Sequence, residues 1–177
     1  MTRTLRVLMM PENENCAQTK WIRAMAIRTV LSIIGADQSD DDLKPAIGLC
    51  ETSQAHLTLL VVALAAPPPI GDYAVYVSDS WYEEREKDLA RLKKRTESAK
   101  ETVGKSGISA EVNSAYVEMA YLNSTVGERA IYADLTLIGS ELASNKFMQE
   151  AVLDGALFHS RTPALLLPKG ARPTLTT

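Results

Sequence analysis

The sequence predicts a five-stranded parallel α/β sandwich, a doubly wound sheet with helices on both faces. Short β-branched or apolar runs alternate along the chain with longer amphipathic segments, which is typical of βαβ units. The run Leu57–Leu64 is apolar at nearly every position, which indicates a strand buried on both faces. A sheet of such strands needs helices on each side of it, so the two observations predict the same architecture.

The first half of the regular region predicts a strand, a turn and two helices around Leu57–Leu64. The β-branched run Thr29–Ile34 indicates the first strand, and Gly35-Ala36-Asp37-Gln38 indicates a turn. We expect Ser39 and the three aspartates after it to begin a helix, because hydroxyl and carboxylate oxygens stabilise the free N–H groups at a helix start. Ser80–Gly104 places apolar residues on one stripe and predicts a long amphipathic helix.

The second half predicts three further strands and two helices. Ile108–Ser114 alternates apolar and polar residues, as a half-buried strand does. The elements expected after it are a helix at Met119–Ala133, a strand at Leu135–Ile138, a loop at Gly139–Ser144, a helix at Asn145–His159 and a strand at Ala164–Leu167.

Ligands of doubly wound sheets lie beyond the carboxyl ends of the strands. The candidate ligand loops are therefore Gly35–Ser39, Ala65–Gly71, Ala115–Val117 and Gly139–Ser144.

Composition argues against several other classes of protein. The chain has 177 residues, 46% of them hydrophobic, and a formal net charge of −3, without a Lys/Arg-rich stripe, so we expect no nucleic-acid partner. Its longest apolar run, Leu57–Ala66, is about half a membrane span, so we expect no membrane partner. With only Cys16 and Cys50, it is expected to be a reduced, cytoplasmic protein, and Cys50 is expected to be buried. We interpret Asp40–Asp42 as helix capping rather than a metal site, and His56 and His159 as structural.

The ends of the chain differ from the middle. Residues 1–24 are predicted to be an appended arm, with a first strand at Thr4–Met10, an early start codon or a mitochondrial-type presequence as alternatives. Residues 25–169 form the predicted domain, and residues 170–177 a tail or interdomain linker.

The strand motifs resemble those of the universal stress protein family. Ala133–Ser140 resembles the family's fourth-strand signature, His56–Val62 its second strand and Thr162–Pro168 its last strand, in the same order along the chain. The resemblance implies the adenine-nucleotide alpha-hydrolase-like sandwich. It also implies a binding site beside Gly35, Ala36, Asp37, Val62, Gly139 and Ser140.

The family's ATP-binding loop is only partly matched. That motif has a glycine, two residues, a glycine, nine residues, and a glycine followed by Ser or Thr. Gly139 matches the first position, whereas Leu142 and Glu150-Ala151 stand at the others. Because Glu150 would repel phosphate, we expect a stress-response binding or regulatory module that is not an enzyme and has no cofactor. The alternative is an ATP- or AMP-binding protein, or a slow ATPase, that uses the same cleft.

The resemblance also implies a partner for the last strand. In this family that strand pairs antiparallel with its counterpart. We therefore expect a homodimer through Ala164–Leu167, since an unpaired edge exposes N–H and C=O groups. The tail after Leu167 resembles an interdomain linker, so the alternative is a second universal stress domain beyond the end of this chain.

Overall fold

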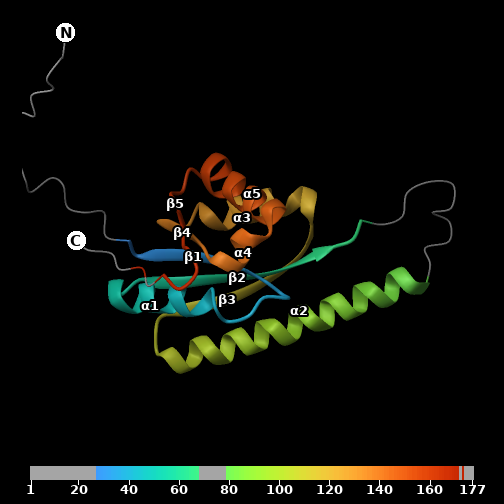
Figure 1. The fold of residues 1–177 in the computed structure, drawn as a ribbon, viewed down its shortest axis with the longest axis horizontal. Helices are drawn as coiled ribbons and strands as arrows, with labels where there is room; N and C mark the ends of the chain where they lie inside the picture. Colours follow the sequence, from blue (N-terminus) through green and yellow to red (C-terminus); the bar gives the residue numbers. More distant parts are fainter. Residues whose placement is uncertain (1–26, 68–78, 172, 174–177) are drawn as a thin grey trace, which may run out of the picture.

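The computed structural model describes residues 27–67, 79–171 and 173 (Figure 1). The predicted arm at residues 1–24 and most of the predicted loop Ala65–Gly71 lie outside the described residues. The elements are β1 (Thr29–Gly35), α1 (Leu43–Ser53), β2 (His56–Ala65), α2 (Asp79–Ser106), β3 (Ala110–Glu118), α3 (Met119–Ala130), β4 (Leu135–Ile138), α4 (Ser140–Ser144), α5 (Lys146–Asp154), the π-helical turn η2 (Gly155–His159) and β5 (Ala164–Leu166).

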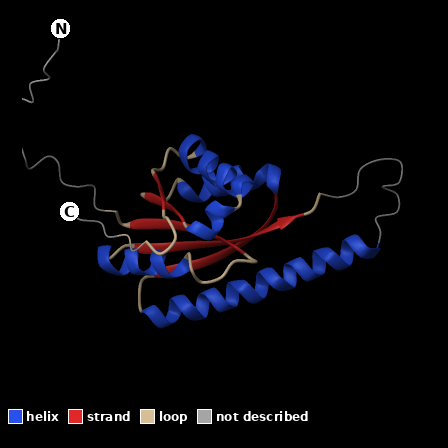
Figure 2. Ribbon diagram, viewed as in Figure 1, coloured by secondary structure: helices blue, strands red, loops and turns tan. Residues whose placement is uncertain are grey.

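The five strands form one parallel sheet in the order β3-β2-β1-β4-β5 (Figure 2). β1 lies in the middle, and its Ile33 is in register with Leu60 of β2 and Ile138 of β4. The chain leaves β1 first toward β2 and β3, and later returns to add β4 and β5 on the other side. The predicted fold class is therefore confirmed, and the topological switch point lies between β1 and β4.

Helices cover both faces of the sheet. In Figure 1, α1 and α2 lie on one side of the strands and α3, α4 and α5 on the other. The first layer shares a core with side chains such as Ile34 and Leu59, and α2 contributes Leu92, Ala99 and Val103. The second layer packs on the opposite side chains of the same strands, including Leu31, Ile33 and Leu60. Within the described ranges, none of the helices is long and apolar enough to cross a membrane.

Three local predictions differ from the structure at the carboxyl edge of the sheet. α1 begins at Leu43 rather than beside Ser39, so the aspartates lie in the preceding loop. Residues expected as the loop Gly139–Ser144 form the short helix α4 instead. β3 continues to Glu118, so Ala115–Val117 belongs to a strand paired with β2 and is not a loop.

Candidate functional site

The carboxylate of Asp42 joins the loop between β1 and α1 to the start of α4 at the carboxyl edge of the sheet. Asp42 precedes α1 and is 3% exposed, and its oxygens accept the backbone N–H groups of Glu141 and Leu142 at 3.0 and 2.9 Å. Gly139, at the end of β4, packs so closely on this carboxylate that a β-carbon there would overlap it. Charge-assisted hydrogen bonds replace the water that a buried carboxylate loses. Asp42 thus caps α4, which is a correction to its expected role at the start of α1.

Glu141 makes the reverse connection. Its carboxylate accepts both the N–H and the hydroxyl of Ser39 at 2.9 Å. The loop before α1 therefore donates one backbone N–H and one hydroxyl to a carboxylate of α4, and α4 donates two backbone N–H groups to a carboxylate of that loop. Ser39 does not cap α1, because its hydroxyl oxygen accepts the N–H of Asp41 at 3.1 Å and turns the loop back on itself. We call Ser39, Asp42, Glu141 and the backbone of Leu142 the interloop clamp.

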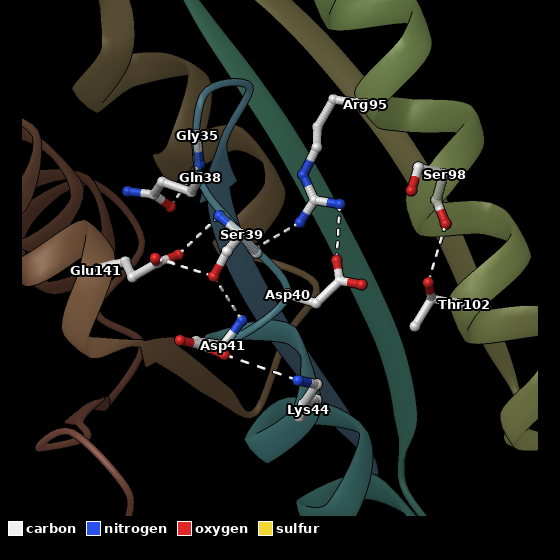
Figure 3. A network of polar contacts seen from close by, with 10 residues as sticks. All are labelled: Gly35, Gln38, Ser39, Asp40, Asp41, Lys44, Arg95, Ser98, Thr102 and Glu141. Carbon is white, nitrogen blue, oxygen red and sulfur yellow. Dashed lines mark hydrogen bonds and ion pairs between the residues drawn. The ribbon is translucent and has the colours of Figure 1, made fainter.

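Arg95 of α2 holds the clamp from the other side. Its guanidinium donates to the Asp40 carboxylate and to the Ser39 carbonyl oxygen, each at 2.8 Å, and its side chain is only 10% exposed. Figure 3 shows Arg95 and Glu141 on opposite sides of Ser39. The loop between β1 and α1 is therefore fixed to α2 on one side and to α4 on the other.

A cavity of about 280 Å³ lies at the carboxyl ends of β1 and β2. Arg91 of α2 lines it and donates to Asp37 at 2.6 Å and to Asp88 at 2.9 Å. The hydrogen bond to Asp37 raises the pKa of the Arg91 guanidinium further above its already high value, so Arg91 stays charged. Asn145, whose side chain caps α5 by accepting the N–H of Met148, lines the cavity as well. The cavity thus combines apolar strand ends with a few convergent polar groups, as small-molecule sites do.

The predicted binding residues fall into two groups. Gly35, Ala36, Asp37 and Val62 line the 280 Å³ cavity together. Gly139 lies against Asp42 and does not line this cavity. Ser140 lines a separate cavity of about 660 Å³ between α1 and the chain segment that follows β5. The structure therefore brings together four of the six predicted residues. The other two, Gly139 and Ser140, lie beside Asp42 of the clamp.

The positions that correspond to the family's other glycines face away from the cavity. Leu142 is fully buried in the core beneath α4 and α5. Glu150 lies on the exposed side of α5, with its carboxylate 3.9 Å from the Lys146 ammonium. Neither residue lines the 280 Å³ cavity.

Sequence reasoning assigned no binding role to Arg91, Arg95 or Glu141. The two arginines are four residues apart on one helix and so share a face. A pair of cations on a helix face opposite an aspartate-rich loop is the signal from which their role could have been found. Glu141 carries no such signal, because its partners are backbone N–H and hydroxyl groups.

The histidines and the buried cysteine contact neighbouring side chains or the core. His56 Nδ1 lies 2.8 Å from the Ser109 hydroxyl, and His159 Nε2 lies 3.7 Å from an Asp154 oxygen. Cys50 is buried as predicted, and burial raises the pKa of its thiol to about 11, which disfavours the reactive thiolate. In the part of the chain that the structure describes, no group of His, Cys, Asp and Glu side chains is placed to hold a metal ion.

Comparison with known proteins gives matches among solved structures. No family model matches the chain. No curated protein matches it either. One similar structure is a universal stress protein in complex with cAMP, at 18% identity and a TM-score of 0.48, with 82% of this chain and 99% of that chain covered. Another is a protein from the universal stress protein family from Burkholderia pseudomallei, at 19% identity, a TM-score of 0.48 and coverage of 82% and 98%. A third is the universal stress protein from Archaeoglobus fulgidus in complex with dAMP, at 12% identity, a TM-score of 0.48 and coverage of 80% and 98%.

Proposed function

We propose that this chain is a cytoplasmic binding or regulatory module of the universal stress protein type, without catalytic activity of its own. Its strand motifs, Ala133–Ser140 and Thr162–Pro168 among them, support the type. The observation that carries the proposal is the cavity at the ends of β1 and β2, which four predicted binding residues line together. Its volume of about 280 Å³ is just below the range of about 300–1,000 Å³ for small-molecule sites, which suits a compact ligand.

The residues that follow β4 support the absence of ATP binding through the family's glycine loop. Glycines in such a loop let the backbone approach phosphate. Leu142 instead turns its side chain into the core, and Glu150 carries a negative charge on α5. Triphosphate binding would need the removal of a core side chain and the approach of phosphate to a carboxylate.

The second candidate function is adenine-nucleotide binding in the same cavity, with slow ATP hydrolysis as its enzymatic form. The position of Asp37 at the cavity favours it, because Asp37 is one of the binding residues that the resemblance implies. Hydrolysis would further need a general base aimed at a water molecule. The carboxylate of Asp37 is already engaged by Arg91 at 2.6 Å.

Calorimetric titration distinguishes the two functions. ATP with Mg²⁺ is expected to bind no more tightly than a Kd of about 1 mM, because the loop after β4 offers it no glycine-lined approach. AMP tests the second function: if it binds in the cavity, Arg91→Ala is expected to change its Kd, because Arg91 lines the cavity. Lys94→Ala, an exposed position one turn later on α2, is the matched control and is expected to leave the Kd unchanged. A micromolar Kd for ATP in the unmodified chain would contradict the proposal.

The edge of the sheet supports a homodimer as the partner state. β5 pairs only with β4 among the described strands, so its outer edge is open to a second copy or to a second domain after residue 169. The Leu167 N–H donates to the Ile138 carbonyl oxygen at 2.9 Å. Because N–H direction alternates along a strand, the N–H of Leu166 points away from β4 and that of Leu165 points toward it.

Proline substitutions in β5 test this dimer. Leu166→Pro is expected to shift the chain from dimer to monomer with little loss of folding, since it removes an outward donor. Leu165→Pro is the matched control and is expected to destabilise the monomer, since it removes a donor to β4. Light scattering at micromolar concentration gives the mass, and thermal melts give the stability. A mass of one chain for the unmodified protein, unchanged on concentration, would refute the homodimer.

A further inference from the structure

We propose that Asp42 is a built-in anion that occupies the anion-binding position beyond β4 and thereby excludes phosphate chains from the site. This inference rests on the proposed function and specifies the class of ligand: a compact molecule without a phosphate chain that extends from the cavity to β4. Asp42 is then a specificity-determining residue.

The donors around Asp42 are those that a bound anion would use. The switch point between β1 and β4 is where doubly wound sheets receive ligands, and backbone N–H groups that follow a strand bind anions there. Here the N–H groups of Glu141 and Leu142 lie 3.0 and 2.9 Å from the two Asp42 oxygens, and the Ser140 hydroxyl lies 3.4 Å from one of them. Because Gly139 has no side chain, the carboxylate reaches the end of β4 directly.

The clamp makes this internal anion hard to displace. Asp42 is 3% exposed, and the loop that carries it is tied to Glu141 and Arg95 on either side. An incoming phosphate would also meet the Glu141 carboxylate, which adds like-charge repulsion. Arg95, one of the cations that contact this loop, already donates to Asp40 and to the backbone.

The open cavity and the clamp have different linings. The cavity is lined by the ends of β1 and β2 and by residues of α2 and α5, and none of the clamp residues lines it, whereas the clamp joins the loop before α1 to α4. A ligand whose phosphate chain extends from the cavity to β4 would need both places at once, and the protein's own Asp42 fills one of them. A compact ligand needs only the cavity.

The test measures the Glu141 and Leu142 amides in the full chain by ¹H–¹⁵N spectra and hydrogen exchange, with tripolyphosphate and ATP–Mg²⁺ as probes. In the unmodified chain we expect both amides to be protected from hydrogen exchange. We also expect neither probe to shift their signals at millimolar concentration. In Asp42→Ala they should exchange about tenfold faster or more. Their signals should then move on addition of tripolyphosphate, with a rise in Tm. Asp41→Asn, the exposed neighbour that pairs with Lys44 at 3.7 Å, is the control and should match the unmodified chain.

Two results would overturn the proposal. One is movement of the Glu141 and Leu142 signals when tripolyphosphate is added to the unmodified chain, because the phosphate would then displace Asp42. The other is an Asp42→Ala variant that keeps its amide protection and does not respond to tripolyphosphate. If Asp42→Ala does not fold, Asp42→Asn decides, since it retains one acceptor oxygen without the charge and should lose protection at one of the two amides. Failure of compact ligands to bind the cavity would refute the proposed function. It would not change the result for Asp42→Ala, whose response to tripolyphosphate is measured independently at the Glu141 and Leu142 amides.

Discussion

Leu142→Ala is expected to lower the free energy of unfolding by about 3 kcal/mol, because it removes buried methyl groups and leaves a cavity. Leu142 is 0% exposed and belongs to a buried cluster with Ile138, Met148 and Val152. For a chain of this size the loss corresponds to a fall in Tm of roughly 6–12 °C. Denaturant unfolding and thermal melts both measure it.

Leu89→Ala is the matched control for this prediction. It makes the same change in composition at a side chain of α2 that is 41% exposed, and it should change stability by no more than about 0.5 kcal/mol. Equal effects of the two substitutions would show that residue 142 lies outside the core. The segment after β4 would then be free to act as a phosphate loop, against the proposed function.

The parallel sheet can be predicted from the sequence because its central strands, β1, β2 and β4, are apolar on both faces. Leu57–Leu64 differs from β2 by one residue at each end, and Leu135–Ile138 coincides with β4. α2 is similarly clear, because its apolar stripe is long enough to show helical periodicity over several turns. These patterns lie within short stretches of sequence, so they can be recognised without knowledge of the contacts between distant segments.

The clamp could not be predicted, because its partners are far apart in the sequence. Asp42 and Glu141 are separated by 99 residues, and the groups that Asp42 binds are backbone N–H groups, which every residue except proline carries. Asp42 therefore has the local pattern of a cap for α1. α4 has only five residues, too few for a period to be recognised, so Leu142 has the local pattern of a loop residue.

The predicted binding residues fall into two groups because the contacts of Gly139, like those of the clamp, involve residues far away in the sequence. Gly35 ends a well-defined strand, Ala36 and Asp37 follow it, and Val62 lies on the neighbouring strand, so parallel register brings them to one edge. Gly139 also ends a strand, but its surroundings depend on which side chain crosses from the β1–α1 loop. Only the structure identifies that side chain as Asp42.

Gly155→Ala is expected to lower the free energy of unfolding by about 3 kcal/mol, because it forces apart two helical segments that touch through their backbones. Gly155 begins η2, which packs on α3. A β-carbon there would overlap the Asn123 carbonyl oxygen and would lie 3.0 Å from Val126 Cβ and 3.1 Å from the Gly127 nitrogen. Two of these three neighbours are backbone atoms, which cannot turn aside as a side chain can.

Gly104→Ala separates this steric effect from the general effect of replacing glycine in a helix. Gly104 lies in α2, and a β-carbon there would meet no atom within 4 Å, so alanine should stabilise the chain by about 0.5–1 kcal/mol. The two substitutions are thus expected to change the denaturation midpoint in opposite directions, with unchanged m-values if only stability changes. A Gly155→Ala variant as stable as Gly104→Ala would mean that α3 and η2 do not approach as closely as described, and that the position of α5, whose first turn lines the cavity, is set by other contacts.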